Sequence, residues 1–454
     1  MASVADVVSC LSTDQPDAER RPGEADVLHQ YHSLLLELIT VPLFTGVIGY
    51  ITNWTGVLML FRPLEFHGIR VPGLRMVFRY LPKRVQVLPL FREDGRVGWQ
   101  GIIPSRADKM ASLAVDKGLS KLGNVSDFYR QMEPEKLAAH MTVIAQSEIR
   151  AIVETLIERE NPQLWRNLPS QVKEAVHARV RQQLPEIVEE MTDAFGDNID
   201  QLLDVKLMVI KHFTANPQLL NDLFMIMGKR ELRFMVNFGF YFGFPMGFLT
   251  VAFLELVARE WYVLPIGGII IGWVVNYIGI SMIFEPIFPK WYCPWRQGLL
   301  LKRQPEITVL YAAMVAEKVM TLENIGHELL HGANADRTKA LLETTLRPAV
   351  DKSMGPARVA VKFAMGSSNY DRLKDSMASE VSAFVPMMYA DEEFGIHQAG
   401  NIKTFIAKQM SAMGPDDFVE LLRSAIKQDE WLLFLHGGVL GAFAGLLHLA
   451  IFGV

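Results

Sequence analysis

The sequence predicts an all-α integral membrane protein: a helical bundle of about four spans, built on a duplicated module, with two helical domains on the cytoplasmic side. Three observations predict this fold. Nearly uncharged apolar segments are long enough to cross a bilayer, which takes about 20 helical residues. One of these segments recurs later in the chain. The stretches between them place apolar residues at helical spacing, as amphipathic helices do.

The repeated segment is the feature around which the rest of the chain is arranged. Residues 36–63 and 259–286 align at a constant offset of 223 residues, and the alignment places Asn53 over Asn276. Self-similarity over such a length sets the architecture before any single element does. We therefore predict two membrane helices that share one pattern.

Composition excludes several classes of protein. Half of the residues are hydrophobic and the net charge is only −5, which argues against a disordered chain and against a nucleic-acid partner. Cys10 and Cys293 lie far apart and indicate neither a disulfide framework nor a thiolate metal cluster. Residues 1–32 are acidic and polar, unlike a signal peptide, and are predicted to form a flexible tail.

The first membrane element is predicted over residues 33–62, and Pro42 inside it leaves a re-entrant hairpin open as an alternative to a span. The region from Arg62 to Lys109 then carries ten cations against four acidic residues. Loops next to membrane spans are rich in Lys and Arg on the cytoplasmic side. The first element is therefore expected to run inward, most simply through the inner membrane of a cell.

Two cytoplasmic helical domains are predicted, over residues 63–233 and 287–430. Within the first, Gly98–Arg106 (GWQGIIPSR) has turn residues at both ends and is expected to form an interfacial loop. Three prolines are expected to break or kink its helices: Pro162, Pro169 and Pro185.

The remaining spans are a membrane helix pair over residues 234–286 and a C-terminal membrane helix over 431–454. Both regions carry glycines four residues apart, which let helices approach closely in lipid: Gly239, Gly243, Gly247, Gly437, Gly441 and Gly445. The charge rule gives both copies of the repeated element the same direction. The duplication is therefore predicted to be parallel rather than inverted.

Several motifs resemble one known family. Ile48–Trp54 (IGYITNW), Leu58–Pro63 (LMLFRP) and GWQGIIPSR are similar to the opening motifs of the multi-pass membrane family called domain of unknown function 445, with its YheB-like and YjiN-like members. The resemblance extends over residues 36–125, and the glycine-rich final span resembles that family's C-terminal helix. This chain departs in carrying a second copy, in which Arg62 becomes Glu285. The resemblance implies a membrane location and helical soluble parts, and no established activity.

Polar side chains inside the apolar helices are the first candidate site. Asn53 and Asn276 lie within the repeated element, and Glu37 and Glu260 lie nearer its outer ends. A polar group in hydrocarbon is costly unless it is paired or faces water. One hypothesis is that the four residues face a shared polar cleft that conducts a substrate or ion. The alternative is that they only join helices by hydrogen bonds.

A basic cluster is the second candidate site. Arg75, Arg79, Lys83 and Arg84 form the densest group of cations after the first membrane element. Such clusters bind the headgroups of anionic lipids. The alternative is that they only fix the orientation of the chain in the membrane.

The third candidate is a short metal motif. His327, Glu328 and His331 spell HExxH, in which two imidazoles bind Zn²⁺ and the glutamate activates water. No third ligand follows at a known spacing, and the aligned segment Asn124–Gln131 has nothing similar. We therefore predict no metal, no cofactor and no enzymatic activity, and keep a membrane zinc peptidase as a remote alternative.

The sequence favours a non-enzymatic membrane scaffold or envelope-organising protein that contacts lipids, partner proteins or a second copy of itself. A transporter or lipid-transfer element, with a cleft between the duplicated helices, is the alternative. The identity of the substrate or partner and the oligomeric state do not follow from the sequence.

Overall fold

The computed structural model describes residues 22–80, 82, 86, 88–256, 260–355, 358–388 and 391–452. The chain divides into two compact units, each described here by itself. The membrane unit takes in Met1–Trp54, Met235–Gly279 and Phe434–Val454, and the helical unit takes in Thr55–Phe234 and Ile280–Leu433.

We call the chain up to residue 256 the first half and the chain from residue 263 the second half. The first half contains α2 (Pro22–Phe61), β1 (His67–Arg70), α3 (Leu74–Phe78), β2 (Arg96–Trp99), α5 (Ile102–Ser105), α6 (Ala107–Leu122), α7 (Val125–Gln131), α8 (Pro134–Glu160), α9 (Pro162–Asn167), α10 (Ser170–Leu202), α11 (Val205–Ala215) and α12 (Pro217–Leu256). The second half contains α13 (Val263–Phe284), α14 (Leu299–Lys302), α15 (Gln304–Met314), the π-helical η1 (Val315–Val319), α16 (Leu322–His331), α17 (Ala335–Met354), α18 (Arg358–Met365), α19 (Ser367–Met388), α20 (Glu392–Ala412), α21 (Pro415–Lys427) and α22 (Glu430–Phe452).

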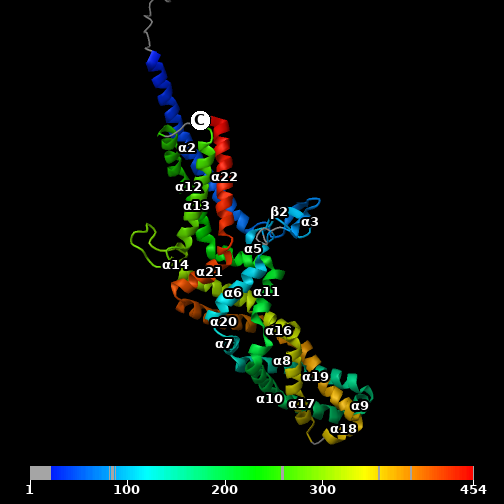
Figure 1. Ribbon diagram of the computed structural model, residues 1–454. Helices are drawn as coiled ribbons and strands as arrows, with labels where there is room; N and C mark the ends of the chain where they lie inside the picture. The colour runs from blue at the N-terminus through cyan, green and yellow to red at the C-terminus, as the bar shows by residue number, and fades with distance from the viewer. Residues whose placement is uncertain are drawn as a thin grey trace, which may run out of the picture. The chain divides into compact units, whose positions relative to one another are not determined.

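The predicted all-α membrane fold is confirmed. Among the described residues, four helices are long and apolar enough to cross a membrane, namely α2, α12, α13 and α22, which are labelled in Figure 1. Large apolar side chains remain exposed along α2, at Ile39, Leu43 and Val47. A helix face of this kind is stable against lipid and unfavourable in water. Sheet is limited, within the same residues, to the two-stranded antiparallel pair of β1 and β2.

The first membrane helix differs from its prediction at its start. α2 begins at Pro22, inside the predicted tail of residues 1–32, and residues 1–21 lie outside the described part of the chain. Proline suits the first turn of a helix because that turn leaves its N–H groups unbonded anyway. α2 also continues through Pro42 as one helix, a geometry that favours a span over the re-entrant hairpin.

One local prediction for the first half is wrong, and the predictions for its three prolines have different outcomes. Gly98–Arg106 is not a loop: its first residues belong to β2, and Ile102 and Ile103 in α5 are completely buried. Pro162 begins α9 and Pro169 caps α10, as helix breakers do. Pro185 lies inside α10 without ending it.

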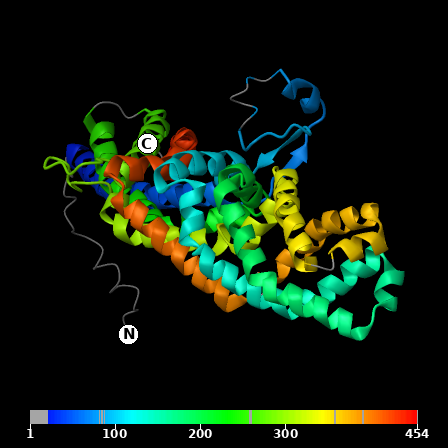
Figure 2. The same ribbon diagram turned by 90° about the horizontal axis from the view of Figure 1, so that it is seen from below.

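The helical unit is assembled from matching pairs of helices in the two halves. In the first half α6 packs on α11 and α8 on α10, and in the second half α15 packs on α20 and α17 on α19. The contacts between the halves also match, since α8 packs on α19 and α10 on α17. Both Figure 1 and Figure 2 show the green-blue α8 and α10 beside the yellow α17 and α19. The two predicted helical domains are therefore interleaved in one unit.

One apolar core joins these four helices. It contains Met141 and Val153 from α8, Leu184 from α10, Leu346 from α17 and Leu373 from α19, all at least nine-tenths buried. An amphipathic helix buries its apolar stripe wherever another stripe is available. The periodicity that predicts each helix does not specify its partner, which here comes from the other half.

Candidate functional site

The two intramembrane asparagines are buried and hydrogen-bonded. Asn53 is completely buried, and its Nδ2 donates a hydrogen bond of 2.6 Å to the backbone oxygen of Met235 in α12. Asn276 is 1% exposed, and its Nδ2 donates at 3.1 Å to Gly272 O, one turn earlier in its own helix α13. The first bond links two membrane helices, whereas the second stays within one.

Each asparagine lies beside a close approach of glycine backbones. A Cβ added at Gly49 of α2 would overlap Gly239 O of α12, and one added at Gly272 of α13 would overlap Gly437 O of α22. Asn53 Nδ2 also borders Gly239, and Asn276 Nδ2 borders Gly437. The first membrane helix of each half thus packs on the last helix of the same half, through the small residues that lipid-embedded helices use.

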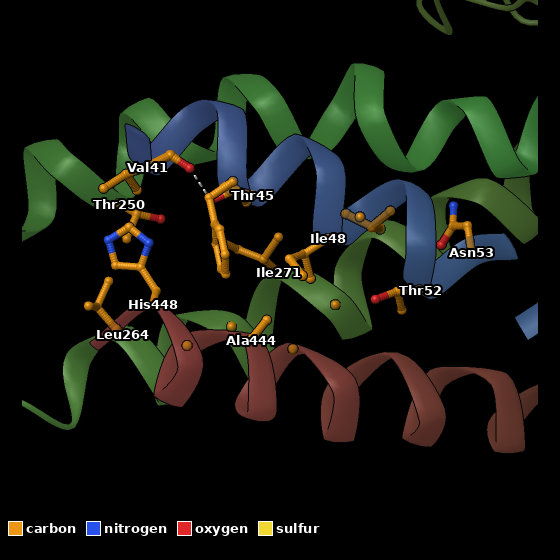
Figure 3. A pocket seen from close by; sticks show the side chains of 17 residues that line it. Val41, Thr45, Ile48, Thr52, Asn53, Thr250, Leu264, Ile271, Ala444 and His448 are labelled. Carbon is orange, nitrogen blue, oxygen red and sulfur yellow. Dashed lines mark hydrogen bonds between the residues drawn. The ribbon is translucent and has the colours of Figure 1, made fainter. Parts of the chain in front are cut away.

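A cavity of about 60 Å³ lies within the membrane unit, between α2, α13 and α22, with Thr250 contributed by α12. Figure 3 shows His448 at one end and Asn53 at the other. Thr45 Oγ1 donates to Val41 O at 2.7 Å, so this hydroxyl is satisfied within its own helix. A space of this size holds a few water molecules.

The cavity does not collect the four polar residues of the first hypothesis. Asn53 lines it, and Asn276, Glu37 and Glu260 are not among its lining residues. Glu37 is partly buried and Glu260 is exposed. His448 is buried, forms one wall of the cavity and lies edge-to-face on Phe44 at 5.1 Å.

Two buried ion pairs connect the halves inside the helical unit. Arg106 Nη2 lies 2.9 Å from Asp429 Oδ1, and Arg303 Nη1 lies 2.6 Å from Glu231 Oε2. Both carboxylates are 4% exposed in side-chain area. Each arginine therefore pairs with an acidic residue of the other half. We call these two contacts the crossed ion pairs.

Burial and ion pairing act in opposite directions on the pKa values of the crossed pairs. Burial raises the pKa of the Asp429 carboxyl, and the charges of Arg106 and Lys109 act in the opposite direction. The pKa of Arg303 is raised, first by its hydrogen bonds to Glu306 and then by those to Glu231. A buried charge without its partner is strongly unfavourable, so each pair holds its two segments together.

Sequence reasoning missed the crossed pairs, although a signal was present. Arg106 follows Gly101 by five residues, as Arg303 follows Gly298. The acidic partners are also matched. Glu231 lies eight residues before Gly239, and Asp429 lies eight residues before Gly437, which are the first glycines of the two series spaced four residues apart. Aligning the halves on their glycines would have placed all four residues in register.

The ends of α2 and α13 make the same three hydrogen bonds. Trp99 Nε1 donates to Arg62 O at 3.2 Å, and Trp295 Nε1 donates to Glu285 O at 2.7 Å. A glutamine side chain and a glycine N–H complete each set. Gln100 bonds Leu64 O and Gly101 bonds Pro63 O in the first half; Gln297 bonds Ile287 O and Gly298 bonds Pro286 O in the second.

The basic cluster is described in part. Arg75 and Arg79 are exposed and line a hollow of about 780 Å³ together with Arg70, whereas Lys83 and Arg84 lie outside the described residues. Phe78, Gln86, Glu93 and Asp94 complete its lining. Asp94 is paired with Arg96 at 2.6 Å, and the hydrogen bond from Arg96 lowers the pKa of Asp94.

The HExxH residues lie on α16 in the helical unit. His327 and His331 are exposed with ring centroids 5.0 Å apart, but Glu328 is buried and its carboxylate lies 3.4 Å from Lys211 Nζ. Its Oε1 also accepts a hydrogen bond from Ala333 N–H. Within the described residues, no three His, Cys, Asp or Glu side chains form a group that could hold a metal ion. The glutamate's contacts are those of a residue that closes the end of a helix.

The fold and the buried polar contacts define an integral membrane protein of the helical-bundle class. The chain is 33% identical over 99 residues to the UPF0754 membrane proteins of Bacillus thuringiensis (strain Al Hakam) and Bacillus cereus (strain AH187), and 32% identical to that of Bacillus cytotoxicus. The match takes in 19% of this chain and 26% of the length of these relatives. No family model and no solved structure matches the chain.

Proposed function

We propose that this chain is a non-enzymatic membrane scaffold, built from two copies of one module, whose helical unit contacts partner proteins. The proposal includes placement in an inner membrane with the helical unit on the cytoplasmic side. It also includes membership of the domain-of-unknown-function-445 family, on the motifs described above. The names of the UPF0754 relatives agree with a membrane protein and go no further.

The observation that carries the proposal is how the buried polar groups are used. Asn53 bonds a neighbouring helix, Arg106 and Arg303 pair across the halves, and Glu328 bonds Lys211. Each of these contacts fixes one segment against another. When the buried polar groups of a protein all make internal contacts, they stabilise its structure and are not available to bind or convert a substrate.

An exposed apolar site on the helical unit is available for a partner. Phe363 is 91% exposed and Val359 is 78% exposed, one turn apart on α18. Exposed aromatic residues of this kind serve as anchors in protein interfaces. They are the residues that a scaffold would use and a transporter would not.

The experiment compares two variants of the full-length protein purified in lipid nanodiscs. Val359→Asp/Phe363→Asp should remove stoichiometric complexes, with a partner or a second copy, seen by cross-linking and mass photometry. Asn53→Leu should leave them intact. Complexes that survive the α18 substitution, or that are absent from the wild type, would contradict the scaffold proposal.

A transporter is the second candidate, and the cavity between α2, α13 and α22 is the observation that favours it. Asn53 and His448 bring polar atoms to its two ends. Transport requires these residues, so Asn53→Leu and His448→Leu should abolish solute or proton flux in proteoliposomes. Flux that depends on both residues would place the transporter ahead of the scaffold.

A further inference from the structure

Each half carries an insertion directly after its first membrane helix. In the first half it is the lobe, residues 64–99, which contains β1, α3 and β2 (Figure 1). In the second half it is the loop, residues 287–295, which has no helix or strand. Both insertions start after a proline and close at a tryptophan, as the matching hydrogen bonds show.

Chain connectivity keeps both insertions near the membrane surface. The apolar stretch of α2 ends at Phe61, and β1 starts at His67. An extended segment of that length reaches about 20 Å at most, and the hydrogen bonds from Trp99 and Gln100 hold the end of the lobe at its start. The loop begins equally soon after Phe284, the end of α13.

The surface of the lobe is unusual for a part of a protein that faces only water. Ile69, Met76 and Tyr80 are 76%, 81% and 85% exposed, and Val71 and Val77 are also exposed. Exposed apolar side chains gathered in so small a segment indicate a surface that another phase or molecule covers.

Cations are interleaved with these apolar side chains. Arg70, Arg75 and Arg79 line the hollow of about 780 Å³, and they bring three positive charges to it. Two acidic residues border the same hollow, but Asp94 is already paired with Arg96, which leaves Glu93. Arginine recognises phosphate through its planar, multiply donating guanidinium group.

The loop repeats this chemistry with different residues. Trp291 is 90% exposed, and Phe288 and Tyr292 are 56% and 64% exposed. Lys290 Nζ lies 5.6 Å from the centre of the Tyr292 ring. Tryptophan and tyrosine are enriched at the headgroup level of membranes because one end of each ring is apolar and the other polar.

We propose that the lobe and the loop are two interfacial anchors that bind the headgroups of anionic phospholipids on the same face of the membrane. The same face follows from the chain. Gly49 meets Gly239 and Pro42 meets Gly247, so α12 runs antiparallel to α2. Only six residues separate the end of α12 from the start of α13, so α13 runs back and ends on the side where α2 ends. The apolar residues of both insertions enter the headgroup region, while the three arginines of the lobe and Lys290 of the loop bind lipid phosphates. The inference rests on the membrane location and does not require the scaffold role.

The first experiment measures lipid binding to the detergent-purified full chain by native mass spectrometry. Wild-type protein should retain phosphatidylglycerol over phosphatidylcholine. Arg70→Gln/Arg75→Gln/Arg79→Gln should weaken the binding of phosphatidylglycerol about tenfold or more, because three cations are removed. The matched control, Arg166→Gln/Arg181→Gln/Lys339→Gln, removes three exposed cations from helices outside the lobe. Equal losses in both triple variants, or no loss in the first, would overturn the headgroup site.

The second experiment reports the depth of the insertions in proteoliposomes. A fluorophore such as NBD, attached to Met76→Cys or Trp291→Cys in a background without Cys10 and Cys293, should shift to the blue and be quenched by lipids brominated on the acyl chain. Val143→Cys on α8, which is 68% exposed, should show neither effect. Emission at 76 and 291 like that at 143 would overturn the anchors. The scaffold is tested separately, through the complexes that depend on α18.

Discussion

The two halves of the chain agree at their framework and differ at their insertions. The hydrogen bonds from Trp99 and Trp295, the glycine contacts between the first and last membrane helix, and the crossed ion pairs all recur. Between the recurring proline and tryptophan, however, the first half has a lobe with two strands and the second a short loop. Contacts that position helices are matched in the two halves, whereas the segments that leave the framework and return to the same point differ in length and structure.

The asparagines show a smaller difference of the same kind. Asn53 bonds another helix and Asn276 bonds its own, although both border a glycine of the facing helix. The two equivalent asparagines are therefore expected to contribute differently to stability, and substitutions can measure that difference.

The largest expected effect comes from the crossed ion pairs. Arg303→Met removes the ion-pair partner of the buried Glu231, and Arg106→Met removes that of Asp429, so each should lower the free energy of unfolding by about 3–5 kcal/mol. Unfolding in mixed micelles, followed by circular dichroism, measures the loss.

The double variant Arg303→Met/Glu231→Leu removes both charges and should recover most of that stability. Arg130→Met is the matched control, because the Arg130–Asp127 pair is exposed and worth little. If Arg303→Met cost no more than Arg130→Met, the halves would not be joined in this way.

Two adjacent glycines give the next test. A Cβ at Gly268 would overlap Gly441 O, whereas a Cβ at Gly267 meets nothing within 4 Å. Gly268→Ala should therefore cost about 1–3 kcal/mol, with Gly267→Ala close to neutral. Gly49→Ala, which meets Gly239, extends the test to the first half. Thermal unfolding of the three variants in one detergent would expose any difference between the halves, and equal behaviour of 267 and 268 would refute the close approach.

The asparagine comparison predicts a smaller effect. Asn53→Leu removes a bond between α2 and α12 and should cost about 0.6–2 kcal/mol. Asn276→Leu removes a bond within α13 and should cost less. Steric trapping or reversible unfolding in bicelles resolves differences of this size. A larger loss at Asn276 would reverse our assignment of the two roles.

The smallest effect is expected at the HExxH residues. His327→Ala/His331→Ala changes two exposed side chains and should alter stability by no more than about 0.5 kcal/mol. Elemental analysis of the purified protein should find well under one zinc per chain in both forms. Near one zinc in the wild type, lost in the variant, would instead put the peptidase alternative ahead of the scaffold.

The sequence predicts the parts of this fold that local chemistry controls. Apolar length predicts the four membrane helices, and proline predicts the breaks at residues 162 and 169. Partner choice is not local: the periodicity of α8 predicts a buried face but not that α19 covers part of it. Arg106 and Arg303 look like ordinary cations in a basic region, because their burial depends on carboxylates that are distant in the sequence: Glu231 lies 72 residues before Arg303, and Asp429 lies in the other half from Arg106.

The crossed ion pairs also bear on how such a chain can change over generations. In an assembly of two identical chains, every substitution appears twice, so a change to one insertion would change both at once. Here the arginine of each half meets the acid of the other within one polypeptide, and each position is altered singly. The two halves can then stay alike at the ion pairs that join them and differ elsewhere. A single chain can therefore carry a two-stranded lobe on one half and a short loop on the other, which two identical subunits cannot.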